Sequence, residues 1–164
     1  VKEIYEFKKQ INESSIYRTE QSFWEIRGRG AIPFVKSFNK LSVDIVKELY
    51  PDNNYNLSSF IESKGWFTLF EEKDRICPHR DGLNEGRVCG LLIYLNEDWK
   101  DGDGGELILI DKDENSIKIE PTFGTVVVLD FLNIKNNLSH EVLPVKGDFK
   151  RWTYIHFLTE VPST

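Results

Sequence analysis

The stretch ICPHRDG, residues 76–82, places one of only three histidines of this 164-residue chain two positions before an aspartate. In an extended segment, residues i and i+2 face the same side, so His79 and Asp81 should point together. One imidazole and one carboxylate make an incomplete metal site, which needs a third ligand. His140, which opens the apolar segment HEVLPV, is the best candidate. Two imidazoles and one carboxylate can occupy one face of an octahedral metal and leave three positions open.

This facial triad is typical of non-haem Fe(II) oxygenases, whose open positions suit a bidentate cosubstrate and oxygen. Each residue alone also has a purely structural interpretation. A lone histidine is usually a surface group or a satisfied core group, and an aspartate before glycine usually marks a turn. A zinc site built from Cys77 and His79 is disfavoured, because the remaining ligands and their spacing are missing.

Two further side chains favour the oxygenase hypothesis. Arg151 lies on the next predicted strand after His140, and its guanidinium is a permanent fork of donors suited to a carboxylate. Tyr94 lies in the strand after the His79 segment, from where its phenol could reach the same carboxylate. A surface arginine and a tyrosine at the edge of the core are the structural alternatives.

The elements that must position these residues change in character near residue 65. Before it, apolar spacing predicts helices over 1–11 and 41–51, with Ser42 as a cap and Pro51 as a stop, separated by an irregular loop at 27–34. After it come short segments rich in β-branched and aromatic residues, separated by turn residues. These predicted strands are 65–72, 87–96, 105–110, 116–121, 124–131, 140–145 and 151–158.

Seven strands at this spacing predict an antiparallel sandwich or jelly roll with flanking helices. We expect one domain over 1–164, in which 1–64 supplies helical support and substrate loops and 65–160 forms the catalytic core. The length and the 40% hydrophobic content are those of a globular domain with a real core.

Charge and composition exclude several classes of partner. The net charge of −6 argues against bulk attraction to nucleic acid or anionic lipid, and the longest apolar runs are too short to span a membrane. Cys77 and Cys89 are too few for a disulfide framework, so we expect free thiols in a reducing, cytoplasmic compartment. The chain contains no methionine, and we therefore expect that its start was processed or trimmed.

With these motifs in order, residues 66–158 resemble the prolyl 4-hydroxylase-like branch of the 2-oxoglutarate/Fe(II)-dependent dioxygenases. The matching stretches are HRD, LLIYLNEDW followed by GGEL, IEPTFGTVVVLDF, and HEVLPV followed by RWTYIHF. They occur in the order of the family and at about its spacing. The resemblance implies a double-stranded β-helix core, a jelly-roll or cupin-like fold, with helices outside.

The resemblance also implies roles for individual residues. The metal ligands would be His79, Asp81 and His140, with no catalytic residue beyond them. Arg151 would pair with the distal carboxylate of 2-oxoglutarate, assisted by Tyr94. Arg151 is preferred over Lys150 as the basic residue because R-x-T at 151–153 matches the commoner pattern of the family, and by strand alternation Thr153 shares the Arg151 face. The apolar pocket for the cosubstrate would be lined by Leu92, Leu107 and Val142.

The implied reaction hydroxylates an unactivated C–H bond with O2 and releases succinate and CO2. The cofactors would be Fe(II) and 2-oxoglutarate, with ascorbate as reductant. The expected substrate is a prolyl residue of a peptide or protein, and no nucleic acid or membrane is expected as a partner. The alternatives are a small molecule, such as a free amino acid or natural-product intermediate, and a cupin-like metal-binding protein without catalysis. Phe23, Trp24 and Arg29 are candidate substrate contacts by location alone.

Overall fold

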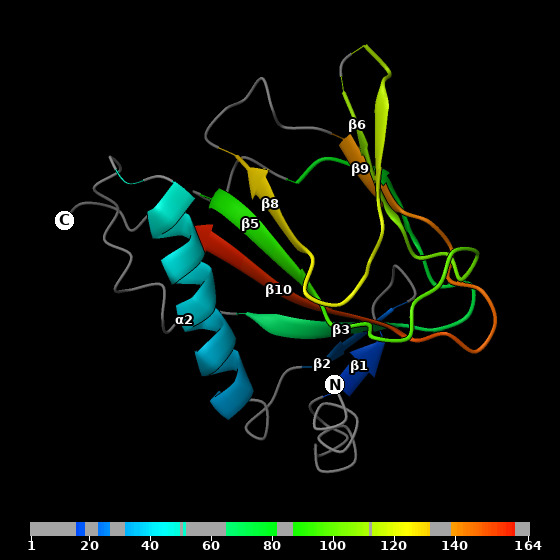
Figure 1. Ribbon diagram of the computed structural model, residues 1–164, viewed down its shortest axis with the longest axis horizontal. Coiled ribbons are helices and arrows are strands. Elements are labelled where there is room, and N and C mark those ends of the chain that lie inside the picture. Colours follow the sequence, from blue (N-terminus) through cyan, green and yellow to red (C-terminus); the bar gives the residue numbers. More distant parts are fainter. Residues whose placement is uncertain are drawn as a thin grey trace.

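A computed structural model describes residues 16–18, 23–26, 32–49, 51, 65–81, 87–111, 113–131 and 139–159. Two antiparallel sheets and one helix make up this part of the chain (Figure 1). The larger sheet has the strand order β1-β2-β3-β10-β5-β8, and the smaller has the order β4-β9-β6-β7. The elements are β1 (Ile16–Arg18), β2 (Trp24–Ile26), α2 (Ile32–Leu49), β3 (Trp66–Phe70), β4 (Ile76–His79), β5 (Arg87–Tyr94), β6 (Leu107–Ile110), β7 (Ser116–Ile119), β8 (Val126–Asp130), β9 (Ser139–Val142) and β10 (Arg151–Thr159).

The two sheets form the jelly-roll core expected from the sequence. Strands that are distant in the chain lie side by side, as when β10 pairs with both β3 and β5. An apolar cluster draws on both sheets, with Phe70, Leu92 and Tyr94 from the larger and Leu107 and Val142 from the smaller. The faces of the two sheets therefore bury each other, as alternating strands require.

Helix α2 packs on the other face of the larger sheet, and in Figure 1 it lies beside the ends of β5 and β10. Val43 and Val46 of the helix pack against Cys89, Leu91 and Leu158 of the sheet. A buried side-chain hydrogen bond joins the Tyr154 hydroxyl on β10 to the Asn39 amide oxygen on α2. Gly65 leaves room for this contact, because a Cβ there would overlap the tyrosine hydroxyl.

The predicted start of this helix at Ser42 is wrong, since α2 begins at Ile32 and includes part of the segment predicted as a loop. Pro33 permits the early start, because a proline in the first turn lacks only an N–H that would have no helical partner. Ser42 lies inside the helix, where its hydroxyl donates to the Phe38 carbonyl at 2.9 Å. The helix ends at Leu49, two residues before the predicted stop at Pro51.

Three strands were not predicted from the sequence. β1 and β2 extend the larger sheet beyond β3, and β4 pairs with β9 in the smaller sheet. β1 and β2 have only three residues each, and β4 contains Pro78, a residue that argues against a strand. The helix predicted over 1–11 lies outside the described residues.

Helix α2 lacks the length of apolar sequence that a membrane crossing needs, and no other helix is seen in the described part of the chain. Both cysteines carry free thiols, with Cys77 exposed and Cys89 buried. Burial raises the pKa of the Cys89 thiol to about 12, with a smaller effect of the nearby Asp130 carboxylate in the same direction.

Candidate metal centre and cosubstrate pocket

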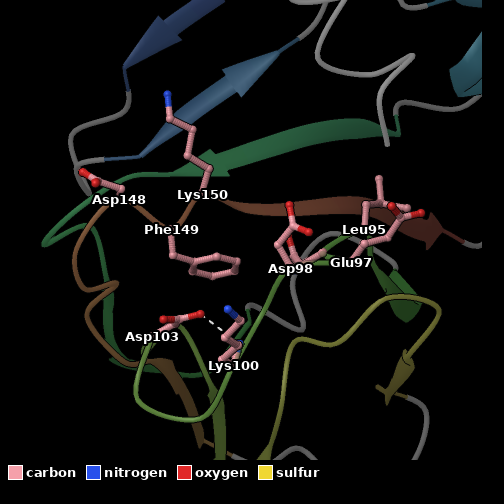
Figure 2. A pocket seen from close by; sticks show the side chains of 9 residues that line it. Leu95, Glu97, Asp98, Lys100, Asp103, Asp148, Phe149 and Lys150 are labelled. Atoms are coloured by element: carbon pink, nitrogen blue, oxygen red, sulfur yellow. Dashed lines mark hydrogen bonds between the residues drawn. The ribbon is translucent and has the colours of Figure 1, made fainter.

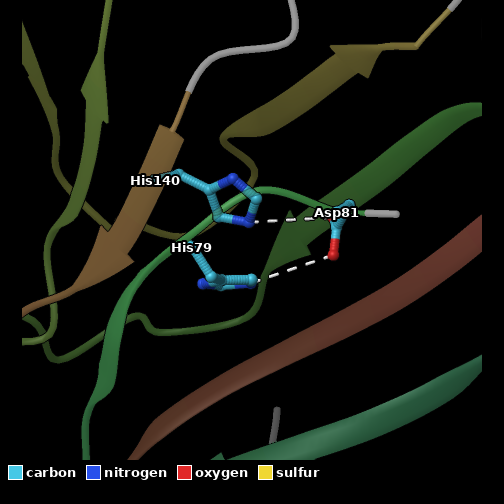
Figure 3. Close-up of side chains that lie close together, drawn as sticks. All are labelled: His79, Asp81 and His140. Carbon is cyan, nitrogen blue, oxygen red and sulfur yellow. Dashed lines mark ion pairs between the residues drawn. The ribbon is translucent and has the colours of Figure 1, made fainter. Parts of the chain in front are cut away.

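Antiparallel pairing of β4 with β9 brings two histidines together. His79 and His140 are direct partners across the two strands, and their ring centroids lie 4.2 Å apart. Asp81 follows the end of β4, and its carboxylate turns toward both rings (Figure 3). His79 Nε2 is 3.8 Å from Asp81 Oδ1, and His140 Nε2 is 3.7 Å from Asp81 Oδ2. Strand register thus joins the three side chains that the sequence singled out.

The backbone beside His79 decides which ring nitrogen faces the carboxylate. His79 Nδ1 lies 3.0 Å from the Cys77 carbonyl oxygen, which can only accept a hydrogen bond. Nδ1 therefore donates this hydrogen bond, so that Nε2 is the nitrogen through which the neutral imidazole would bind a metal. Ser139 adds a second tie between the strands, because its hydroxyl donates to the His79 carbonyl at 3.2 Å.

The spacing of the donor atoms fits a metal ion. One donor atom from each of His79, Asp81 and His140 lies within 4.8 Å of the others. Bonds of about 2.1 Å to an octahedral metal would hold neighbouring donors about 3 Å apart, which small side-chain rotations can reach. Two neutral imidazoles and a carboxylate suit Fe(II) and related divalent ions. Among the described residues no other cluster of this kind occurs, and Cys77 takes no part in it.

Arg87 also contacts this cluster, although the sequence did not single it out. Its Nη1 atom lies 3.6 Å from Asp81 Oδ1, so this oxygen faces both a guanidinium and an imidazole. The guanidinium carbon lies 4.1 Å from the ring centroid of Phe157, which limits its movement. The sequence gives no signal of this contact, because Arg87 is simply the first residue of β5. The contact joins it to Asp81, which follows β4.

A cavity of about 370 Å³ opens beside the triad. Three lining residues, Leu92, Leu107 and Val142, are those assigned to the cosubstrate pocket by resemblance. The full lining consists of Phe23, Glu25, Trp66, Ile76, His79, Asp81, Arg87, Leu92, Leu107, Leu129, His140, Val142, Ile155 and Phe157. The cavity is therefore mainly apolar, with a few polar groups gathered near the candidate metal ligands.

The three candidate substrate contacts have different outcomes. Phe23 lines the cavity and stacks on Phe70, with ring centroids 4.7 Å apart. Trp24 is placed only by its backbone in β2, and Arg29 lies outside the described residues.

Some cavity residues could have been found by extending the strand alternation already used for Arg151 and Thr153. Ile155 and Phe157 continue the same i, i+2 series along β10 and line the cavity. Trp66 belongs to β3 and Leu129 to β8, and only the strand order of the larger sheet brings these two side chains to the same cavity.

Arg151 is a buried cation with an incomplete set of partners. It is 1% exposed, and burial lowers the pKa of its guanidinium. Nε donates to the Gly105 carbonyl at 2.7 Å, and Nη1 donates to the Thr153 hydroxyl at 2.8 Å. Nη2 is buried without a hydrogen-bond partner, and none of the described residues supplies a carboxylate within ion-pair distance.

Tyr94 repeats this pattern beside Arg151. Its buried hydroxyl makes no hydrogen bond of standard geometry with any described residue, and the guanidinium carbon of Arg151 lies 4.9 Å from its ring centroid. Burial raises the pKa of the Tyr94 phenol, and both the Arg151 charge and a weak hydrogen bond between the two side chains oppose this rise. A neutral O–H donor and a guanidinium edge therefore lie together in the core. Leu92, Leu107 and Val142 share one apolar cluster with Tyr94 and also line the cavity, so they connect the two regions.

Lys150 contrasts with Arg151, its neighbour in the sequence. The Lys150 side chain is exposed, and its Nζ forms an ion pair with Glu71 Oε1 at 3.1 Å. The alternation along β10 directs the two basic residues to opposite sides, so only Arg151 reaches the interior.

A second cavity, of about 360 Å³, lies on the loop after β5 (Figure 2). Its lining is mostly charged and includes Glu97, Asp98, Lys100 and Asp103, with Phe149 on one side. It contains none of the residues of the triad, and it marks the outer surface of a loop whose inner side contacts Arg151.

Comparison with known proteins agrees with this fold. A double-stranded β-helix holding two histidines and a carboxylate defines a metal-dependent oxygenase class. Residues 65–159 match the family model of the 2OG-Fe(II) oxygenase superfamily. The chain belongs to this superfamily and is an enzyme of the dioxygenase class, whose cofactor and cosubstrate are Fe(II) and 2-oxoglutarate.

Solved structures place the fold with the prolyl hydroxylases. A prolyl-4-hydroxylase from Pseudomonas putida matches with a TM-score of 0.68 and 17% identity, over 96% of this chain and 84% of that one. A Trichoplax adhaerens prolyl hydroxylase, in complex with a hypoxia inducible factor peptide fragment, matches with a TM-score of 0.67 and 16% identity, over 96% and 76%. The viral collagen prolyl hydroxylase of Paramecium bursaria Chlorella virus-1, in complex with 2-oxoglutarate, matches with a TM-score of 0.63 and 17% identity, over 96% and 87%.

Proposed function

We propose that this enzyme hydroxylates a prolyl residue of a peptide or protein, with Fe(II) bound by His79, Asp81 and His140 and 2-oxoglutarate anchored by Arg151 and Tyr94. The observation that carries the proposal is the buried Arg151, whose positive charge is not paired with a carboxylate of any described residue. A buried cation with unsatisfied donors is costly unless an anion pairs with it. Among the described residues, Arg151 Nη2 and the Tyr94 hydroxyl make no hydrogen bond of standard geometry, and together they suit the two oxygens of one carboxylate.

In this proposal, each residue of the site has a separate role in binding the metal or the cosubstrate. His79 presents Nε2 because Cys77 holds its Nδ1 proton, and Asp81 supplies the charge that offsets a divalent ion. Arg151 and Tyr94 hold the far end of the cosubstrate. Leu92, Leu107 and Val142 keep water from the space between the two sites. When bound, Fe(II) activates O2 and couples decarboxylation of 2-oxoglutarate to succinate and CO2 with insertion of one oxygen atom into a C–H bond.

The prolyl substrate is supported by two observations. The fold is similar to prolyl hydroxylases, one of which was solved with a peptide fragment. The cavity beside the triad offers Trp66, Ile155 and Phe157 as apolar and aromatic surface against which a pyrrolidine ring can pack.

A free amino acid is the second candidate substrate. Besides the candidate metal ligand Asp81, the same cavity is lined by a second carboxylate, that of Glu25, and by the Arg87 guanidinium. A zwitterion needs one charge of each sign, so these two side chains favour a small substrate with an ammonium and a carboxylate.

The test measures succinate formation from 2-oxoglutarate with Fe(II) and ascorbate under air, with a proline-rich peptide or free proline added. Ascorbate as the reductant is part of the proposal. We expect the peptide to gain one oxygen atom by mass spectrometry, and the His140→Ala variant to form no succinate. Hydroxylation of free proline alone would favour the second candidate. Failure of the wild type to bind 2-oxoglutarate in the presence of Fe(II) would overturn the proposal.

A further inference from the structure

The loop between β5 and β6 reaches from the surface to the buried Arg151. Its outer side borders the second cavity, where Asp103 Oδ2 accepts a hydrogen bond from the Lys100 backbone N–H at 2.8 Å (Figure 2). Its inner side is held by Trp99, whose indole N–H donates to the Gly104 carbonyl at 2.9 Å. The next carbonyl, that of Gly105, accepts the hydrogen bond from Arg151 Nε.

Gly104 and Gly105 have backbone conformations that other residues rarely adopt. Their φ angles are +74° and +75°, in the left-handed region. A Cβ on Gly104 would lie 2.0 Å from the Pro144 carbonyl oxygen, so this glycine seats the loop against the segment after β9. Gly104 also forms an isolated bridge with Val145. The loop is therefore fixed at the point where it meets Arg151.

Gly105 leaves no spare room beside the arginine side chain. A Cβ there would lie 2.8 Å from Arg151 Cδ and 3.3 Å from Val145 Cγ2. With Nε held by Gly105 and Nη1 held by Thr153, the guanidinium plane has one orientation. That orientation leaves the Nη2 edge as the unpartnered one.

We propose that Trp99, Gly104 and Gly105 form a positioning device, which fixes the place at which Arg151 presents its Nη2 edge. This place sets the affinity of the protein for the 2-oxo dicarboxylate and its selectivity for the chain length of that cosubstrate. This inference rests on the proposed function, in which Arg151 binds the distal carboxylate. Gly105 is a positioning residue, because it acts through Arg151. A shift of the guanidinium would favour a cosubstrate of different length over 2-oxoglutarate.

The chain offers a matched control for a Gly105→Ala variant. Gly102 lies in the same loop with φ +99°, and a Cβ there would meet nothing within 4 Å. Gly102→Ala therefore introduces backbone strain of the same kind without touching Arg151. A Trp99→Phe variant keeps an aromatic ring but loses the donor to Gly104, and it tests the device without a steric clash.

Each full-length protein would be loaded with Mn(II), which takes the same ligand types, and titrated anaerobically with 2-oxoglutarate by calorimetry. We expect Gly105→Ala to raise the Kd for 2-oxoglutarate about tenfold or more, and Trp99→Phe to raise it less. Gly102→Ala should bind as the wild type does. The Kd for Mn(II) should be the same in all four proteins, since the device lies away from the triad. The preference for 2-oxoglutarate over 2-oxoadipate or oxaloacetate should narrow in Gly105→Ala.

Several outcomes would overturn the inference and leave the proposed function standing. These are wild-type affinity in both Gly105→Ala and Trp99→Phe, equal losses in the two glycine variants, or a parallel loss of Mn(II) affinity. If Gly105→Ala does not fold, the Trp99→Phe titration decides the matter alone. A wild type that binds Mn(II) but not 2-oxoglutarate would instead overturn the proposed function.

Discussion

At the scale of single residues, the two oxygens of Asp81 have different surroundings. Oδ2 faces His140, whereas Oδ1 faces both His79 and the Arg87 guanidinium at 3.6 Å. The Phe157 ring packs against that guanidinium in a cation–π contact. Groups that orient a ligating carboxylate typically change metal affinity by roughly 10- to 100-fold when removed. Arg87 is thus placed to act on a metal without binding it.

Arg87→Gln should weaken Mn(II) binding about tenfold, because Asp81 loses the contact that orients its carboxylate. The opposing effect is relief of repulsion between the guanidinium and the metal, which is weaker where water screens the charges. Calorimetric titration with Mn(II) measures the result. Arg75→Gln, at an exposed position, is the control and should leave the affinity unchanged. Tighter Mn(II) binding in Arg87→Gln would mean that repulsion outweighs orientation.

At the scale of elements, the site depends on one strand pairing and one packed helix. The pairing of β4 with β9 sets His79 opposite His140, and the larger sheet carries Arg151 and Tyr94 on neighbouring strands. Helix α2 covers the far face of that sheet, so it supports the pocket without lining it. Its apolar contacts should therefore affect stability more than ligand binding.

Val46→Ala should lower the free energy of unfolding by about 2 kcal/mol, because it removes buried methyl groups and leaves a space against the sheet. Val46 is 1% exposed within the cluster that joins α2 to β5 and β10. Urea denaturation measures the change, and Glu48→Ala on the exposed side of the helix should stay within about 0.5 kcal/mol of the wild type. A Val46→Ala protein as stable as Glu48→Ala would contradict the packing described for α2.

At the scale of the whole molecule, burial places ionisable groups on both faces of the larger sheet. Arg151 lies on the inner face toward the pocket, whereas Tyr154 and His156 alternate with it along β10. His156 is fully buried, and burial lowers its pKa from 6.5 to about 4. The folded protein therefore holds this histidine neutral at pH values where the unfolded chain would protonate it.

This difference predicts an acid-sensitive stability. Between pH 6.5 and 4 the unfolded chain binds more protons at His156, so stability falls as the pH is lowered through that window. Between pH 7.5 and pH 5 the loss from this group should be about 2 kcal/mol. Urea denaturation at the two pH values measures it, and His156→Gln should lose correspondingly less stability over the same interval. Equal losses in both proteins would show that His156 does not titrate in this window.

Much of the fold followed from local sequence alone. The segments rich in β-branched and aromatic residues and bounded by turn residues predicted β3 and β5 through β10, because these preferences belong to each segment by itself. The candidate ligands and Arg151 were also recognisable, since rare residue types stood in the order of a known family. The choice of Arg151 over Lys150 rested on the R-x-T pattern at 151–153, and the parity of the strand only separated the two residues onto opposite faces.

The tertiary structure decided what depends on pairing and packing. Strand β4 contains Pro78 and gives no strand signal in the sequence, and only its pairing with β9 reveals it. The first half of α2 also packs against the larger sheet, where Phe38 contacts Phe67 and Tyr154, and this packing outweighs the helix-start signal at Ser42. The roles of Arg87 and Gly105 depend on contacts between elements far apart in the chain. Local sequence determines the periodicity of each element and the chemistry of its side chains. Strand register, and which faces bury each other, decide which of these side chains meet at a site.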